Sequence, residues 1–358
     1  MWVFYIMLLV PIVIQHCVWG KRYVDHQKKN QRALAFFFVV VTLLIGLRHE
    51  SVGSDTGNYI YYFENYLKSS WDDLWKNSLE LGFSYFNKII SVFTTNSQIF
   101  LFVSAAAISL LIYPTYKRLC VDPTLTIVLY VSMATFVFSF SGIRQMLAIG
   151  IGFLAYEFTR RKKLFLFILS VVLAIIFHAS AFMLVFMYPL YHVKITKKWL
   201  LAVVPVLGTI FVFNKQIFSM LAFLLEMYTD YDASMTSTGA FTMLILFTIF
   251  AVFSFLIPND QMLDRETIGL RNFLLLAVVL QMFAPLHMIA MRMNYYYIIF
   301  IPVLLPKIIQ ARSERWKEIA VAGRHVMVVF FLVYFFFSAY TSTNNLRVFP
   351  YHFFWESI

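Results

Sequence analysis

Ionisable and aromatic side chains gather directly after a strongly apolar run near the start of the chain. In the stretch LRHESVGSDTGNYIYYF, the carboxylate of Asp55 suits a general base at a membrane surface, and Arg48 offers a guanidinium fork for phosphate. Two glycines predict a bent backbone around Asp55. The alternative for Asp55 is a solvated turn or a salt bridge to Arg48. The candidate functional residues of this stretch are Arg48, Glu50, Asp55 and Tyr59.

Arg144 stands in a second polar stretch, FSFSGIRQMLAIG. The serines and the glycine before it predict a tight turn, after which Arg144 and Gln145 open the next helix. A helix N-terminus presents unpaired N–H groups and the positive end of the helix dipole, which suit an anion. The stretch therefore predicts a phosphate site. An arginine that extends to the membrane interface is the alternative.

His178 lies in AIIFHASAF, at the end of another apolar run. A histidine there suits a proton carrier or a ligand to a polar substrate, and the alternative is a histidine hydrogen-bonded inside a helix bundle. Arg292 lies in HMIAMRMNYYYIIF, close to Tyr295. Arg292 could bind a phosphate while the neighbouring tyrosine rings stack on a sugar. Alternatively, these residues could belong to an aromatic belt at the membrane interface.

Common catalytic motifs are absent from the sequence. There is no Walker-type nucleotide motif, no G-x-S-x-G, no H-E-x-x-H and no cluster with zinc spacing. The D-x-D pair Asp230 and Asp232 could hold a divalent metal through a phosphate, but it is weak by itself. We therefore expect neither cofactor nor metal, and an activated substrate or a gradient must supply the energy.

The elements that must position these residues are apolar helices. The chain has 358 residues, of which 61% are hydrophobic and 13% charged, whereas soluble domains carry about 25% charged residues. Only helices satisfy their own backbone polar groups inside lipid without closing into a barrel. The composition predicts an all-α polytopic membrane protein with one membrane domain over residues 1–358. The net charge of +11 then reflects loop charge that sets topology, and no nucleic-acid partner is expected.

Apolar runs predict about twelve transmembrane helices. Several runs are shorter than the roughly 20 residues of a perpendicular span, so some spans are expected to be short or re-entrant. The expected spans lie near residues 1–19, 33–47, 97–115, 124–140, 143–159, 164–177, 179–192, 199–213, 240–257, 270–287, 294–310 and 325–341.

Loop charge sets the expected orientation. With both termini outside, all but eight of the 29 Lys and Arg residues fall in inside loops, as the positive-inside rule requires. A single helix over 164–192 would invert every later loop, so two short spans fit better. Longer outside loops are expected at about 48–96 and 214–239, and residues 81–93 have the apolar spacing of a helix lying flat on the membrane.

This orientation leaves three arginines without a topological explanation. Arg48, Arg144 and Arg292 each lie at the expected outer end of a span. An ionisable residue at a membrane edge is a functional hypothesis by default. With His178 at the same expected face, these residues predict a site on the outer side.

Four stretches of the chain, in order, resemble the EpsG family, which belongs with the Wzy-type O-antigen and exopolysaccharide polymerases. RHESVGSDTGNYIYYF resembles the R…G.DT..Y...F signature of that family, and SGIRQMLAIGIGFLAY resembles its RQ.lA stretch. LAIIFHASAFMLVFMYPL resembles its fH.sa stretch, and RMNYYYIIFIPVLLP resembles its late Arg-Tyr helix.

The resemblance implies a glycosyltransferase of the bacterial inner membrane with a periplasmic site and both termini periplasmic. Its substrate would be an oligosaccharide on undecaprenyl pyrophosphate, transferred to a sugar hydroxyl of the next lipid-linked unit. The bilayer is an expected partner, and a chain-length regulator is a further candidate. The expected catalytic residues are Asp55, His178 and Arg144, and the expected substrate-binding residues are Arg48, Glu50, Tyr59, Gln145, Arg292 and Tyr295.

Three rival functions share parts of this pattern. An O-antigen ligase or another lipid-linked glycosyltransferase differs in its acceptor and not in its basic chemistry. A flippase or transporter of lipid-linked sugars would need a polar path through the membrane midplane, often with internal repeats, and neither is visible. A membrane acyltransferase would use His178 as its base.

Overall fold

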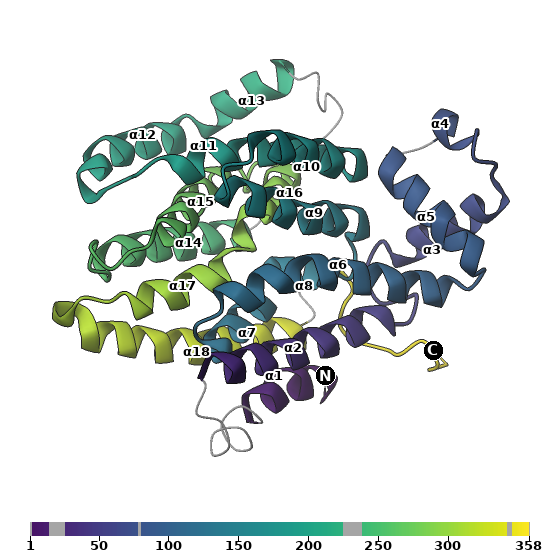
Figure 1. The fold of residues 1–358 in the computed structure, drawn as a ribbon, viewed down its shortest axis with the longest axis horizontal. Coiled ribbons are helices and arrows are strands. Elements are labelled where there is room, and N and C mark those ends of the chain that lie inside the picture. Colours follow the sequence, from purple (N-terminus) through teal and green to yellow (C-terminus); the bar gives the residue numbers. More distant parts are fainter. Residues whose placement is uncertain (1, 14–25, 78–79, 225–237, 342–345, 358) are drawn as a thin grey trace. The chain divides into compact units, whose positions relative to one another are not determined.

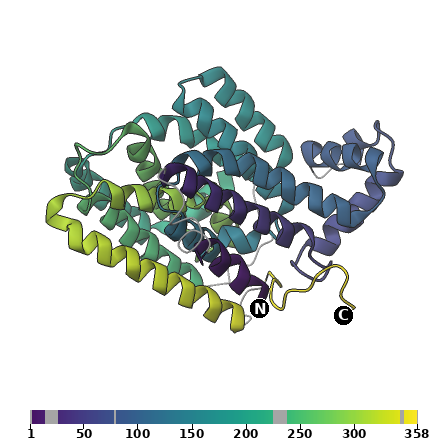
Figure 2. The same cartoon turned by 60° about the horizontal axis from the view of Figure 1, so that its bottom comes forward.

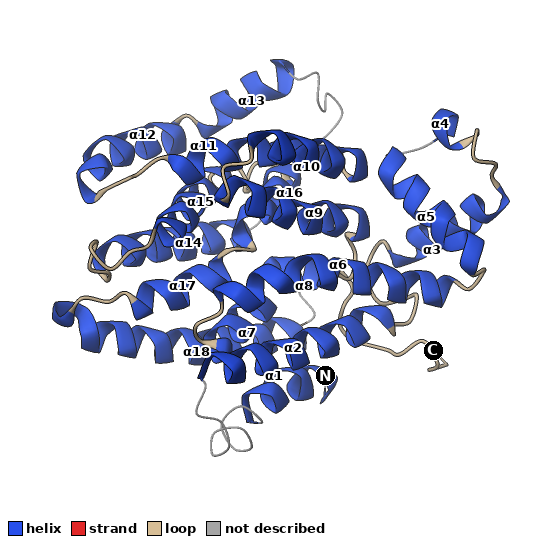
Figure 3. Cartoon of the chain, in the orientation of Figure 1, coloured by secondary structure: helices blue, strands red, loops and turns tan. Residues whose placement is uncertain are grey.

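The computed structural model describes residues 2–13, 26–77, 80–224, 238–341 and 346–357, and within these ranges the chain forms helices and loops without a strand (Figure 3). This confirms the all-helical expectation. The α-helices are α1 (Trp2–Val13), α2 (His26–Gly46), α3 (Thr56–Lys68), α4 (Leu74–Asn77), α5 (Leu81–Phe93), α6 (Ser97–Leu119), α7 (Pro123–Ser132), α8 (Ala134–Phe138), α9 (Ile143–Arg160), α10 (Leu164–Phe177), α11 (Met187–His192), α12 (Leu200–Val212), α13 (Asn214–Leu224), α14 (Thr238–Leu256), α15 (Arg265–Gln281), α16 (Met288–Ile298), α17 (Ile301–Gln310) and α18 (Lys317–Tyr340). The short 3-10 helices are η2 (Ala179–Phe186), η3 (Lys197–Trp199) and η4 (Glu314–Trp316).

Four helices of the described chain are long and apolar enough to cross a membrane, and two bent helix pairs raise this number to six if each pair is one span. The protein is therefore a membrane protein by the length and composition of its helices, whereas the expected twelve crossings stay a prediction. The four helices are Gln27–Gly46, Ser97–Leu119, Gly239–Leu256 and Glu314–Tyr340, and the bent pairs are Ala202–Val212 with Asn214–Met220 and Ile289–Ile298 with Ile301–Gln310.

The chain divides into two compact units. The first unit comprises Met1–Val185 and Ala322–Ile358, and the second comprises Phe186–Val321. Both chain ends belong to the first unit (Figure 1). The single membrane domain expected from the sequence stays a prediction.

A row of helices forms the body of the first unit. Helix α6 packs against α2 on one side and α9 on the other, and α9 packs against α10 (Figure 1). Helix α7 is buried along its whole length and contains no charged residue. This row positions the ends of α2, α9 and α10, from which the candidate site residues project.

Two apolar runs are interrupted, namely residues 124–140, where one span was expected, and residues 164–192, where two short spans were expected. The run 124–140 splits into α7 and α8 at Met133, whose backbone is extended. The run 164–192 is interrupted at His178, which also has an extended backbone, with φ −159° and ψ 122°. A single long helix over 164–192 is therefore excluded, and His178 lies where α10 ends.

Helices α3, α4 and α5 form a small group at one edge of the first unit (Figures 1 and 2). The helix expected over 81–93 is present as α5, and its position on a membrane surface stays a prediction. One face of α5 is buried through Phe83 and Ile90, while Val92 and Phe93 are exposed. The buried face packs on α3 and α10, so that the residue before α5 comes close to the end of α10.

The second unit is built around α15, which packs against α11, α14, α16 and α17. The segment expected to lie outside the membrane, 214–239, begins with helix α13 over Asn214–Leu224, and its position outside the membrane stays a prediction. The sequence of α13 lacks glycine and proline, so nothing in it opposes a helix. Asp230 and Asp232 lie outside the described residues.

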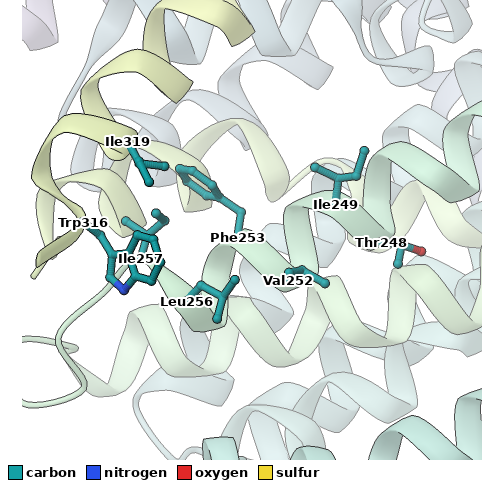
Figure 4. A pocket seen from close by; sticks show the side chains of 8 residues that line it. All are labelled: Thr248, Ile249, Val252, Phe253, Leu256, Ile257, Trp316 and Ile319. Carbon is teal, nitrogen blue, oxygen red and sulfur yellow. The ribbon is translucent and has the colours of Figure 1, made fainter.

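An apolar groove runs along α14 toward the start of α18 in the second unit (Figure 4). Among its lining side chains only Thr248 and Trp316 carry a polar atom. The groove therefore offers no group suited to acid–base chemistry or to holding a phosphate. It is lined by Thr248, Ile249, Val252, Phe253, Leu256, Ile257, Trp316 and Ile319.

Candidate active site

Arg48 begins the first polar stretch and is completely buried in the loop after α2. Its Nε donates to the hydroxyl of Thr56 at 3.3 Å, and its Nη1 donates to the carbonyl of Ile45. Burial lowers the pKa of Arg48 to about 10, so the side chain stays charged near neutral pH. Its Nη2 is buried without a partner among the described atoms. This placement favours a role in holding the loop over direct contact with a substrate.

The expected bend of the first stretch lies at Gly53, which has φ +96°. A Cβ at this position would lie 2.4 Å from the carbonyl oxygen of Phe140. The neighbouring Thr56 hydroxyl donates to the same carbonyl at 3.2 Å, and the N–H of Ser54 donates to the hydroxyl of Ser141 at 2.9 Å. The loop after α2 and the turn before α9 are therefore packed backbone to backbone.

The C-terminal segment holds the same loop from another side. The N–H groups of Gly53 and Ser54 donate to the carbonyls of Arg347 and Leu346 at 3.0 and 2.8 Å. Arg48 also pairs with Phe353 in an isolated antiparallel β-bridge. Sequence reasoning gave this segment no role, because nothing local to it indicates a partner three hundred residues earlier.

Asp55 lies at the N-cap of α3 and is half-buried. Its Oδ1 lies 3.4 Å from the hydroxyl of Ser54, and no ion pair between described residues joins it to Arg48. The salt-bridge alternative for Asp55 is therefore not what the structure contains. Glu50 is exposed in the turn that precedes Asp55.

Arg144 lies in the first turn of α9, as the serine-glycine turn predicted. The ring of Phe138 fills the space in which a Cβ of Gly142 would stand, at 2.1 Å, so the turn needs a glycine there. Arg144 is partly buried, and its Nε is buried without a partner among the described atoms. Gln145 is buried inside the bundle, where its side chain does not face solvent.

Glu80 joins Arg144 to His178. Oε2 of Glu80 lies 3.2 Å from Nη1 of Arg144, and Oε1 lies 2.7 Å from Nδ1 of His178. The N–H of Ala179 donates to the same Oε1 at 2.9 Å. The Glu80 carboxylate is only 12% exposed, so water screens these contacts weakly.

Tyr59 completes this group from α3. Its hydroxyl interacts with Arg144, and its ring packs edge-on against Phe83 at 5.5 Å. Burial raises the pKa of Tyr59, while the charge of Arg144 opposes this effect. Tyr59 therefore stays a neutral phenol that can donate a hydrogen bond. We refer to Tyr59, Glu80, Arg144 and His178 as the Glu80 cluster.

Three of the expected site residues thus come together, namely Tyr59, Arg144 and His178. Glu80 was missed by sequence reasoning, because its partners lie 64 and 98 residues later in the chain. The available signal was an acid placed directly before the amphipathic helix α5. Arg292 and Tyr295 belong to the second unit, where both lie on α16 and Tyr295 is buried.

The comparison with family models shows to which protein family this chain belongs. The model of the EpsG family matches residues 32–353. The chain belongs to the EpsG family. This membership confirms the resemblance seen in the four stretches, and it indicates a polysaccharide polymerase-type glycosyltransferase of a membrane. Neither the curated proteins nor the solved structures contain a match to the chain.

Proposed function

We propose that this EpsG-family protein is a polysaccharide polymerase of the bacterial inner membrane. It transfers a growing glycan from undecaprenyl pyrophosphate to a sugar hydroxyl of another lipid-linked repeat unit, on the periplasmic face. The observation that supports this most is the Glu80 cluster, in which one carboxylate holds an arginine and a histidine side by side. The reaction needs a cation for its leaving group and a base for its acceptor.

The transfer makes one bond and breaks one. The acceptor hydroxyl oxygen bonds to the anomeric carbon of the donor glycan, and the bond from that carbon to the pyrophosphate oxygen breaks. Undecaprenyl pyrophosphate leaves with the bonding electron pair, while the hydroxyl proton passes to a base. Because the donor is activated by its pyrophosphate, no nucleotide hydrolysis is needed, which agrees with the absence of a Walker motif.

His178 is the base in this proposal. Its Nδ1 is engaged by Glu80, and its Nε2 has no protein partner among the described residues. The side chain is 22% exposed, so a substrate hydroxyl can reach it. A histidine with one nitrogen anchored and the other accessible has the arrangement of a general base. Asp55 is the second candidate base, because it is half-buried and its carboxylate accepts a hydrogen bond from the hydroxyl of Ser54.

Arg144 stabilises the leaving pyrophosphate in this proposal. Its Nη1 is bonded to Glu80 and its Nε is buried, so the remaining N–H groups of Nη1 and Nη2 are the ones that would donate to phosphate oxygens. The neutral hydroxyl of Tyr59 lies next to it and adds a further donor. Negative charge that develops on the leaving oxygen would be met by donors already in place, which is an efficient form of transition-state stabilisation.

The experiment replaces Arg144 with alanine and follows the surface polysaccharide of the cell on a gel. We expect the long-chain ladder to collapse to a glycan of one repeat unit at normal protein levels. Arg161→Ala is the matched control, because it makes the same change at the exposed C-terminal end of the same helix. A normal ladder in R144A would contradict the site, and a complete loss of surface glycan would indicate a flippase instead.

A further inference from the structure

Three groups converge on the single carboxylate of Glu80, one from the start of α9 and two from the junction between α10 and η2. Nδ1 of His178 and the N–H of Ala179 meet Oε1 at 2.7 and 2.9 Å. Nη1 of Arg144 meets Oε2 at 3.2 Å. A carboxylate that only capped a helix would not need to collect a histidine, an arginine and a backbone N–H.

We propose that Glu80 is a positioning residue that keeps the proton of His178 on Nδ1 and leaves Nε2 ready to take the proton of the acceptor hydroxyl. This inference rests on the proposed transfer reaction. It assigns to Glu80 a role through His178 and Arg144 and not a contact with the substrate.

The choice of tautomer follows from the donor and acceptor capacity of the groups. An ionised carboxylate only accepts hydrogen bonds, and the two oxygens of Glu80 already accept from the N–H of Ala179 and from Nη1 of Arg144. The proton between Glu80 and His178 therefore belongs to Nδ1. In a neutral imidazole, Nε2 is then the unprotonated nitrogen that accepts. The same charge stabilises the imidazolium that forms once Nε2 has taken the proton.

The second contact of Glu80 sets the distance between the base and the cation. His178 lies at the end of α10, where the chain leaves the helix in an extended conformation. The Ala179 N–H bond holds this departure in place, and the Arg144 bond ties it to the start of α9. A base and a leaving-group cation fixed on one carboxylate are positioned before the substrate arrives, which lowers the entropic part of the barrier.

The test is a double-mutant cycle on the purified protein, with the rate of glycan transfer as the measurement. In Glu80→Gln the side-chain amide can donate to Nδ1 and force the proton onto Nε2, which is the wrong tautomer. We expect the maximal rate to fall about 100-fold, as typical for a group that orients a functional residue, with little change in KM. In the H178A background the same substitution should cause no further loss, because its effect passes through His178.

Matched variants separate positioning from folding. Glu64→Gln makes the same change on the exposed face of α3 and should behave as wild type. Glu80→Asp keeps the carboxylate charge but places it on a shorter side chain, so the E80D enzyme should be slowed less than E80Q. In the H178A background, Glu80→Asp should likewise cause no further loss. If the E80Q protein does not accumulate in the cell, E80D is the variant that tests the inference.

Two results would overturn the inference. One is an E80Q or E80D enzyme with more than half of the wild-type rate, and the other is the same fold-loss from E80Q with and without His178. If H178A polymerises at the wild-type rate, the proposed base is wrong. If H178A is inactive while E80Q is fully active, the base stands and only the positioning role of Glu80 is refuted.

Discussion

Arg48 and Phe353 are joined by an antiparallel β-bridge, although 305 residues separate them along the chain. On either side of this bridge, the N–H of His49 donates to the carbonyl of His352, and the N–H of Phe354 donates to the carbonyl of Leu47. The hydroxyl of Tyr351 adds a bond to the carbonyl of Leu44 at 2.8 Å. The C-terminal segment is thus part of the loop that carries the family signature.

A chain that ends at Asn345 should consequently lose polymerase activity. Without the segment, the N–H of buried Gly53 loses its partner and Arg48 loses its β-bridge to Phe353, and an unpaired buried polar group destabilises a loop. The measurement is the length of the surface polysaccharide at matched protein levels. A chain that ends at Glu356 keeps all of these contacts and should behave as wild type. A normal ladder from the shorter chain would contradict the structural role of the segment.

Gly53→Ala should lower stability strongly. An alanine at φ +96° is strained, and its Cβ would meet the Phe140 carbonyl, so we expect a loss of at least ~2 kcal/mol. Gly57→Ala is the matched control, because a Cβ there meets nothing within 4 Å and Gly57 lies in α3. Thermal unfolding in detergent measures both variants. Equal midpoints for the two would contradict the close packing of the Gly53 loop.

Tyr59→Phe should slow polymerisation while the protein stays folded. The change removes the hydroxyl that interacts with Arg144. Loss of one buried hydrogen bond is worth about 1 kcal/mol, or roughly fivefold in rate if the bond is kept in the transition state. Tyr61→Phe makes the same change on an exposed ring of the same helix and should have no effect. A Y59F enzyme as fast as Y61F would remove Tyr59 from the site.

The orientation predicted from loop charge can be tested by labelling engineered cysteines. Burial raises the pKa of the Cys120 thiol to about 12, so this cysteine stays protonated and reacts slowly near neutral pH. In a Cys17→Ser background, a cysteine at Glu64 should react with a membrane-impermeant maleimide in spheroplasts. A cysteine at Lys163 should react only after the membrane is opened. The reverse pattern would contradict the orientation.

The sequence predicted those helices and turns whose formation depends on neighbouring residues in the chain. The amphipathic spacing of residues 81–93 predicted α5, and the serine-glycine turn predicted the start of α9 at Ile143. The break at Met133 was not predictable, because the apolar run 124–140 continues through it without glycine or proline.

Long-range pairing explains what sequence reasoning missed in the candidate site. The residue types and their neighbours pointed to Arg144 and His178 separately. Glu80 joins them only because α5 packs against α10, and that contact leaves no mark in the residues around Glu80. Burial of Arg48 was equally hidden, since its cover comes from Thr56 and the C-terminal segment.

The central claim is that the protein itself makes glycosidic bonds from lipid-linked repeat units, with His178 as the base. The most direct measurement uses purified protein in proteoliposomes with the undecaprenyl-pyrophosphate-linked repeat unit of the host cell. Wild-type protein should release one undecaprenyl pyrophosphate for each bond formed, and H178A should release almost none while remaining folded. No chain growth by the wild-type protein, or growth by H178A at the wild-type rate, would contradict the account.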